Sequence, residues 1–199
     1  MKGLRGAARR AAAVLLTSAV AGCASLPPGA LDRTAQGRTI EGRLSVRYKD
    51  LETAKEESLS GKFVWTSGAG ETELSLLDPF GQTVALIRSG RERSSITFRD
   101  GRQVDGATPE ALTAKTLGWT VPLLGLRYWL DGKPDPGSAV ARLDDGRLRQ
   151  DGWTIRFIRS DDAADVETAG TPPKRIDLNY PGPPAEIEMR LVVDQRSGA

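Results

Sequence analysis

The residue with the most specific chemistry in this sequence is its single cysteine, Cys23. It directly follows Val20-Ala21-Gly22, and small residues immediately before a cysteine mark the cleavage site of a bacterial lipoprotein signal peptide. In that pathway the sulfur takes a diacylglycerol, the signal is cleaved, and the new N-terminus is acylated. We therefore expect residues 1–22 to be a cleaved signal peptide and Cys23 to be the lipid attachment site.

The composition before Cys23 supports this interpretation. Residues 1–22 carry four basic side chains and no acidic one, and a short apolar run lies at residues 11–16. The alternative is an ordinary signal peptide, or a short transmembrane anchor, with an incidental cysteine. A spanning helix needs about 20 apolar residues, which is more than this run supplies.

The residue types in the rest of the chain exclude several kinds of active site. The sequence has no histidine, and lipidation of Cys23 leaves no free thiol. This excludes nucleophiles activated by histidine, imidazole bases and zinc sites with histidine ligands. A carboxylate pair, as in glycosidases, stays open, although the acids fall mostly in turns such as Asp144-Asp145-Gly146 and Asp161-Asp162. We expect no enzyme activity, no cofactor and no metal.

Length and charge restrict the class of protein further. Removal of the four basic residues of the signal leaves 24 basic and 26 acidic residues, a net charge of about −2. An exported domain that is almost neutral is not expected to bind nucleic acid. Residues 23–199 are enough for one domain with a substantial core. Residues 23–38 contain Pro27-Pro28-Gly29 and predict a lipidated flexible tether, so the domain should occupy residues 39–199.

Apolar and polar residues alternate through most of this domain, which predicts the half-buried strands of an antiparallel meander. The predicted apolar faces of five successive strands are Ile40, Leu44, Val46 and Tyr48; Leu59, Phe63 and Trp65; Leu74 and Leu76; Val84 and Leu86; and Ile96 and Phe98. Further strands are predicted over residues 140–143, 148–150, 153–157, 175–180 and 186–193, and a patternless loop over residues 160–173.

A helical insert at about residues 108–131 interrupts the strands. Thr108-Pro109-Glu110 is a helix start, and the helix should end at Gly118. A second helix should start at Thr120-Val121-Pro122 and end at Gly132. Together the elements predict a mainly β fold with a minor helical part: a single curved antiparallel sheet that forms an open half-barrel, with the helices as a lid over an apolar cavity.

The side chains expected to line this cavity are Val46, Phe63, Trp65, Leu74, Leu76, Val84, Leu86, Leu123, Leu124 and Trp129. Trp65 and Trp129 are candidates for the cavity wall, and Trp153 is expected in the core. The alternative is a filled barrel, in which the same side chains are simply a packed core.

Several segments of the domain carry a family resemblance. They are Gly42-Arg43-Leu44, Gly61-Lys62-Phe63-Val64-Trp65, residues 74–81, residues 118–132, Gln150-Asp151-Gly152-Trp153 and Arg175-Ile176-Asp177-Leu178. In order and spacing they resemble the LolB family of outer-membrane lipoprotein receptors, over nearly the whole mature domain. Two departures are an abbreviated helical segment before the first strand and a C-terminus without the terminal tryptophan. Both concern packing at the edge of the half-barrel.

The resemblance implies a receptor that accepts lipoproteins from the periplasmic carrier LolA and inserts them into the inner leaflet of the outer membrane. Its expected partners are a LolA-like carrier, the acyl chains of cargo lipoproteins, and outer-membrane lipid through the acylated Cys23. The domain would face the periplasm and act as a monomer. The alternative is a sensor or storage lipoprotein of the same half-barrel type, which binds lipid or lipoprotein without transferring it.

Asp78-Pro79-Phe80-Gly81 is a turn sequence, with proline at its second position and glycine at its fourth. The resemblance implies that this loop protrudes and carries a large apolar residue that passes cargo into the membrane. Pro79, Phe80 and Gly81 are therefore the expected membrane-insertion loop. The alternative is that Phe80 folds back onto the sheet and belongs to the core.

Overall fold

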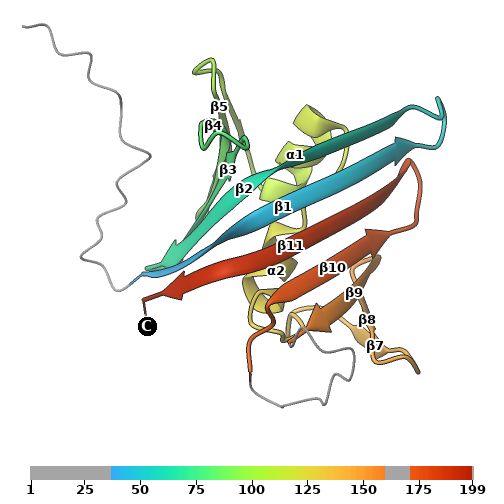
Figure 1. Cartoon of the computed structure of the whole chain (residues 1–199). Helices are drawn as coiled ribbons and strands as arrows, with labels where there is room; N and C mark the ends of the chain where they lie inside the picture. The colour runs from blue at the N-terminus through green and yellow to red at the C-terminus, as the bar shows by residue number, and fades with distance from the viewer. Residues whose placement is uncertain (1–36, 160–170, 199) are drawn as a thin grey trace, which may run out of the picture. The chain divides into compact units, whose positions relative to one another are not determined.

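The computed structural model describes residues 37–159 and 171–198, which form one antiparallel sheet of 11 strands and two α-helices (Figure 1). The strand at each end of the sheet has only one neighbour, so the sheet is open. The mainly β fold and the single open sheet are thus confirmed. Residues 1–36, including Cys23, and residues 160–170 of the expected loop lie outside the described residues.

The first part of the sheet contains β1 (Arg38–Asp50), β2 (Glu56–Gly68), β3 (Glu71–Leu77), β4 (Thr83–Ser89), β5 (Ser94–Phe98) and β6 (Gln103–Gly106). The helices α1 (Pro109–Leu117) and α2 (Leu123–Trp129) follow, and then β7 (Val140–Arg142), β8 (Leu148–Gln150), β9 (Trp153–Ile158), β10 (Arg175–Tyr180) and β11 (Ala185–Ser197). The strand order is β6-β5-β4-β3-β2-β1-β11-β10-β9-β8-β7, so two meanders meet where β1 pairs with β11.

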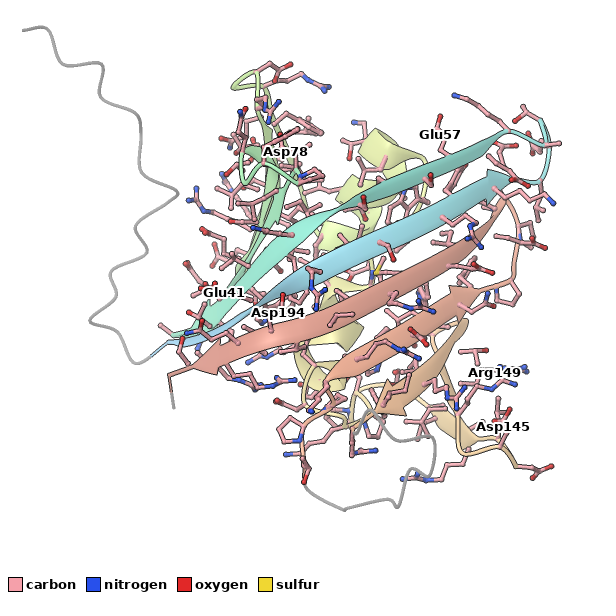
Figure 2. All side chains as sticks on the ribbon, in the orientation of Figure 1. Glu41, Glu57, Asp78, Asp145, Arg149 and Asp194 are labelled. Carbon is pink, nitrogen blue, oxygen red and sulfur yellow. The ribbon has the colours of Figure 1, made fainter. Side chains whose placement is uncertain are left out.

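Alternation along the strands separates a core face from a polar face. Along β1, Ile40, Gly42, Leu44 and Val46 are buried, while Glu41, Arg43 and Ser45, which alternate with them, are exposed. The buried side chains of the sheet form one core with those of the two helices, which cover the same face. Figure 2 shows charged side chains such as Glu41 and Asp194 on the opposite face. Period-two patterning therefore predicted the two faces of β1 correctly.

Two glycines let segments of the sheet approach each other closely. A Cβ atom on Gly42 would lie 2.7 Å from the ring of Phe63, and one on Gly61 would lie 2.1 Å from the carbonyl oxygen of Leu77. The register of β1 against β11 also shifts beside Gly42. Only glycine fits both positions without moving the backbone, which explains why β1 and β2 each contain a glycine at this point.

The predicted inner face of β4 is wrong at Leu86, whereas Val84 does line the apolar cavity described below. Ala85 and Ile87 are buried, whereas Val84 is 44% exposed and Leu86 is partly buried on the opposite face. All four residues are apolar, so alternation along Val84-Ala85-Leu86-Ile87 carries no information on which face is buried. A shift of register between Leu76 and Leu77, opposite the start of β4, also changes the phase there.

Helix α1 has the predicted ends. The Thr108 hydroxyl accepts a hydrogen bond from the backbone N–H of Ala111 at 3.2 Å, and Gly118 ends the helix with a φ of 78°. Helix α2 starts at Leu123, three residues after the predicted start, and has no cap of its own. The Glu110 carboxylate instead accepts the N–H of Leu124 at 2.9 Å, so α1 caps α2.

Trp129 and Gln150 form a fully buried polar contact that joins α2 to β8. The Gln150 amide oxygen accepts the Trp129 indole N–H and the Asp135 backbone N–H, both at 2.9 Å. Gln150→Leu leaves both donors unpaired, at about 1–3 kcal/mol each, so we expect the free energy of unfolding to fall by about 2–6 kcal/mol. Urea unfolding followed by circular dichroism measures this. The exposed Gln103 serves as a control, since Gln103→Leu should change stability by less than about 0.5 kcal/mol.

Candidate functional site

The core contains an apolar cavity of about 330 Å³ between the inner face of the sheet and the helices. Six of the ten predicted cavity residues line it: Val46, Phe63, Trp65, Leu74, Leu76 and Val84. The wall is completed by residues that the sequence argument did not propose, among them Ile87 on β4, Trp119 after α1, and Met189 and Leu191 on β11. The sequence predicted a strand over residues 186–193, but it could not show that this strand pairs with β1 and so brings Met189 and Leu191 to the cavity.

The other four predicted cavity residues lie elsewhere. Leu86 points away from the cavity side of β4, and Leu124 is 52% exposed at the start of α2. Leu123 and Trp129 are buried in the core without lining the cavity. The buried indole N–H of Trp129 donates to the Gln150 side chain, as a buried tryptophan requires.

The cavity opens to solvent near the starts of β2 and β4, as the exposure of two of its lining side chains shows. Leu59 on β2 is 50% exposed and Val84 at the start of β4 is 44% exposed. Asp78, at the end of β3, also lines the cavity. Residues 78–82 connect β3 to β4, and Asp78 and Val84 lie on the two sides of Phe80, so the loop that carries Phe80 borders the mouth of the cavity.

Phe80 stands at the tip of this loop with 90% of its surface exposed. It is therefore not part of the core, and the alternative interpretation is wrong. A tight turn holds the loop: the Gly81 N–H donates to the Asp78 carbonyl at 2.9 Å, and Gly81 has a φ of 85° that favours glycine. Pro79 is likewise exposed. The structure thus places a large apolar side chain in solvent beside an apolar opening.

The Asp78 carboxylate organises the loop electrostatically. Its Oδ1 accepts the backbone N–H groups of Phe80 and Gln82, each at 2.9 Å, and its Oδ2 accepts Nη2 of Arg99 at 2.6 Å. These contacts, led by the Gln82 N–H, hold the pKa of Asp78 below its ordinary value against the opposing effect of desolvation. The carboxylate is consequently ionised at neutral pH. Its contribution to the stability of the folded protein is lost only as the pH falls through this lowered pKa.

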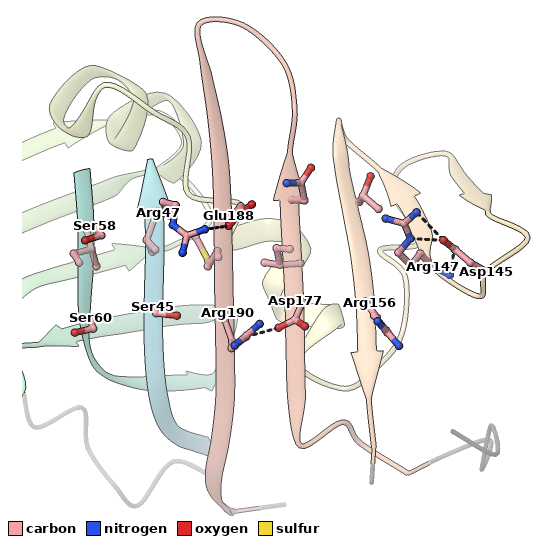
Figure 3. A pocket seen from close by; sticks show the side chains of 16 residues that line it. Ser45, Arg47, Ser58, Ser60, Asp145, Arg147, Arg156, Asp177, Glu188 and Arg190 are labelled. Atoms are coloured by element: carbon pink, nitrogen blue, oxygen red, sulfur yellow. Dashed lines mark hydrogen bonds and ion pairs between the residues drawn. The ribbon is translucent and has the colours of Figure 1, made fainter. Parts of the chain in front are cut away.

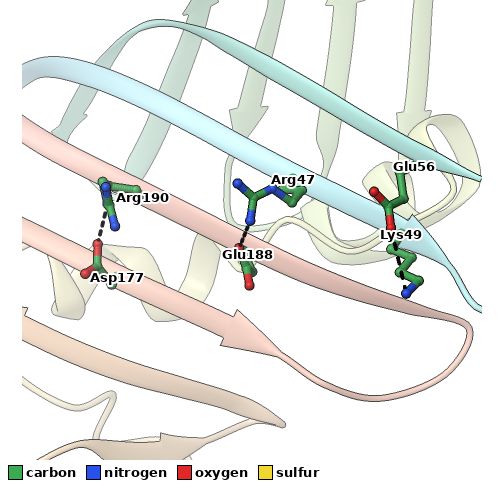
Figure 4. A network of polar contacts seen from close by, with 6 residues as sticks. All are labelled: Arg47, Lys49, Glu56, Asp177, Glu188 and Arg190. Carbon is green, nitrogen blue, oxygen red and sulfur yellow. Dashed lines mark hydrogen bonds and ion pairs between the residues drawn. The ribbon is translucent and has the colours of Figure 1, made fainter.

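A second, polar depression of about 750 Å³ lies on the opposite face of the sheet, across β2, β1, β11, β10 and β9 (Figure 3). Its walls include the hydroxyls of Ser45, Ser58 and Ser60. Many of its charges neutralise each other: Arg47 pairs with Glu188 at 2.7 Å and Arg190 with Asp177 at 2.9 Å (Figure 4). An acyl chain would meet compensated charges and water here, so the apolar cavity is the site suited to lipid.

Neither described helix is long and apolar enough to cross a membrane. Within residues 37–159 and 171–198, no three histidine, cysteine or acidic side chains are grouped as metal ligands would be.

Comparison with known proteins agrees with the motif resemblance. A family model described as "Outer membrane lipoprotein LolB" matches residues 37–195. Outer-membrane lipoprotein LolB of Thiobacillus denitrificans is 35% identical over 201 residues, covering 96% of this chain and 98% of that protein. The protein of the same name from Ralstonia nicotianae is 31% identical over 191 residues, covering 88% and 90% respectively. The chain therefore belongs to the LolB family of outer-membrane lipoproteins.

Proposed function

We propose that this protein accepts lipoproteins from a LolA-like periplasmic carrier and inserts them into the inner leaflet of the outer membrane. The observation that carries the proposal is the position of Phe80, an exposed apolar side chain on the loop that borders the mouth of an apolar cavity. Acyl chains that leave the cavity pass this loop. A phenyl ring can enter the boundary between headgroups and acyl chains, so the loop would bring the mouth to the bilayer surface.

The energetics explain why such a receptor needs a dry path. Each CH₂ group exposed to water costs about 0.8 kcal/mol, so free release of a lipoprotein into the periplasm is prohibitive. Transfer from carrier to receptor to bilayer needs no nucleotide if each successive site holds the acyl chains more tightly. The cavity of about 330 Å³ is at the lower end of the usual range for ligand sites of about 300–1,000 Å³. The helices would therefore move outward from the sheet as cargo enters.

A storage or sensor lipoprotein would share the cavity but would have no use for Phe80. One experiment separates the two functions: a carrier loaded with labelled lipoprotein is mixed with liposomes that contain the full-length, lipidated protein. A receptor should move the label from the carrier into the bilayer, where it resists extraction by salt. A storage protein would keep the label in complex with itself, and this outcome would refute the proposed transfer.

We expect Cys23→Ala to abolish membrane anchoring while leaving cargo uptake intact. The thioether cannot form without the sulfur, whereas the cavity and its loop lie within the described residues 37–159 and 171–198. The variant is exported through a cleavable signal peptide of another protein, and fractionation and labelling with a radioactive fatty acid measure the result. Recovery of the wild-type protein without lipid would contradict the attachment at Cys23. Its recovery in the inner membrane would contradict the outer-membrane location.

A further inference from the structure

The position of Phe80 raises a physical problem. Leu59 and Val84 expose apolar surface at the mouth of the cavity, and Phe80 belongs to the loop that borders this mouth. The hydrophobic effect favours covering such a surface with a nearby phenyl ring, because both lose contact with water. The ring nevertheless remains 90% exposed. Something in the loop must oppose its collapse onto the mouth.

The loop is held first from within. The backbone N–H of Asp78 donates to the Gln82 carbonyl, and the Gly81 N–H donates to the Asp78 carbonyl, both at 2.9 Å. The Asp78 carboxylate accepts the N–H groups of Phe80 and Gln82 through one oxygen. The backbone on both sides of the phenyl ring is thereby attached to a single carboxylate.

Arg99 attaches this carboxylate to the sheet. Its backbone N–H donates to the Val84 carbonyl at 3.1 Å, which fixes it beside the start of β4. Its Nη2 donates to Asp78 Oδ2 at 2.6 Å, and its Nε donates to the Thr83 carbonyl at 3.4 Å. One guanidinium group therefore contacts the residues on both sides of the loop, and the loop cannot tilt without breaking a charge-assisted hydrogen bond.

We propose that Arg99 and Asp78 are positioning residues that hold Phe80 away from the cavity, and that the ring closes the mouth when their contact is lost. This inference rests on the proposed function, because an open mouth and an exposed ring are useful only to a protein that transfers cargo. It adds a second role to the loop, since the phenyl ring that contacts the membrane could also close the cavity as a plug. The ion pair keeps the ring in the exposed position rather than the closed one.

The test uses the mature chain with Cys23→Ala, so that no lipid competes for the probe. Anilinonaphthalene sulfonate reports binding in the apolar cavity, and hydroxyl-radical footprinting reports the exposure of Phe80. In Arg99→Gln the ring should become protected, and the dye affinity should fall about tenfold, as expected when only about a tenth of the molecules have an open mouth. Removing the ring in Arg99→Gln/Phe80→Ala should restore the dye affinity to that of Phe80→Ala alone.

Arg102→Gln is the matched control, because Arg102 lies in the same turn but pairs with Asp100 at 3.9 Å and stacks on Phe98 at 4.3 Å. It should leave both measurements unchanged. An exposed Phe80 in Arg99→Gln, or a dye affinity that stays low in the double variant, would overturn the plug. These measurements involve no carrier and no bilayer, so a failure of cargo transfer by the wild type would refute the proposed function separately.

Discussion

Phe80→Glu is expected to leave cargo uptake close to the wild-type level and to reduce delivery into liposomes at least about tenfold, which corresponds to only about 1.4 kcal/mol. A carboxylate at the loop tip resists entry into the acyl boundary. The side chain is 90% exposed, so the substitution should change the free energy of unfolding by less than about 0.5 kcal/mol. Uptake is measured by transfer of labelled cargo from the carrier, and delivery by resistance of the label to salt extraction.

Phe80→Leu is the matched control, because it keeps an apolar side chain at the tip, and it should deliver cargo almost as well as the wild type. Delivery at the normal rate by a stable Phe80→Glu protein would remove the loop from the mechanism. Loss of uptake and delivery together would instead show that the loop acts on the cavity.

Leu76→Asp is expected to reduce cargo uptake more than about tenfold, because it places a carboxylate in the apolar wall that would contact the acyl chains. Leu76 is only partly buried, so this substitution disturbs the core less than one at the almost fully buried Trp65. Transfer of labelled lipoprotein from the carrier measures uptake. Circular dichroism has to show the native fold before the loss is attributed to the cavity.

Leu86→Asp provides the comparison for this variant. Leu86 is also a partly buried leucine on the neighbouring strand, but its side chain lies on the opposite face of the sheet. It should therefore bind cargo normally. Equal loss of uptake in both folded variants would show that the cavity does not hold the acyl chains.

The sequence predicted the fold where local signals were unambiguous. Alternation along β1 identified Ile40, Leu44 and Val46 as core, and Thr108 and Gly118 identified both ends of α1. Helix α2 begins later than predicted, and its first turn is capped by Glu110, which lies 14 residues before Leu124 in the chain. The residues around the start of α2 give no indication that a side chain of α1 caps it.

The site was predicted to the extent that it depends on strand faces and turn chemistry. The turn sequence predicted a loop at residues 78–81, and the family resemblance implied that Phe80 is exposed at its tip. The alternation of β2 and β3 identified Phe63, Trp65 and Leu74. The contact between Arg99 and Asp78 was not predicted, because it depends on β5 ending beside the loop between β3 and β4. The family resemblance supplied the carrier and the membrane, which no residue pattern names.

The pairing of the first strand with the last has a consequence for the biogenesis of the protein. β1 and β11 are neighbours along most of their length, and they join the two meanders into one sheet. The N-terminal meander cannot gain this partner until the C-terminal residues have arrived, and contacts so distant in sequence form slowly. A lipoprotein that is exported from its N-terminus would therefore complete its sheet only after the whole chain has crossed the inner membrane.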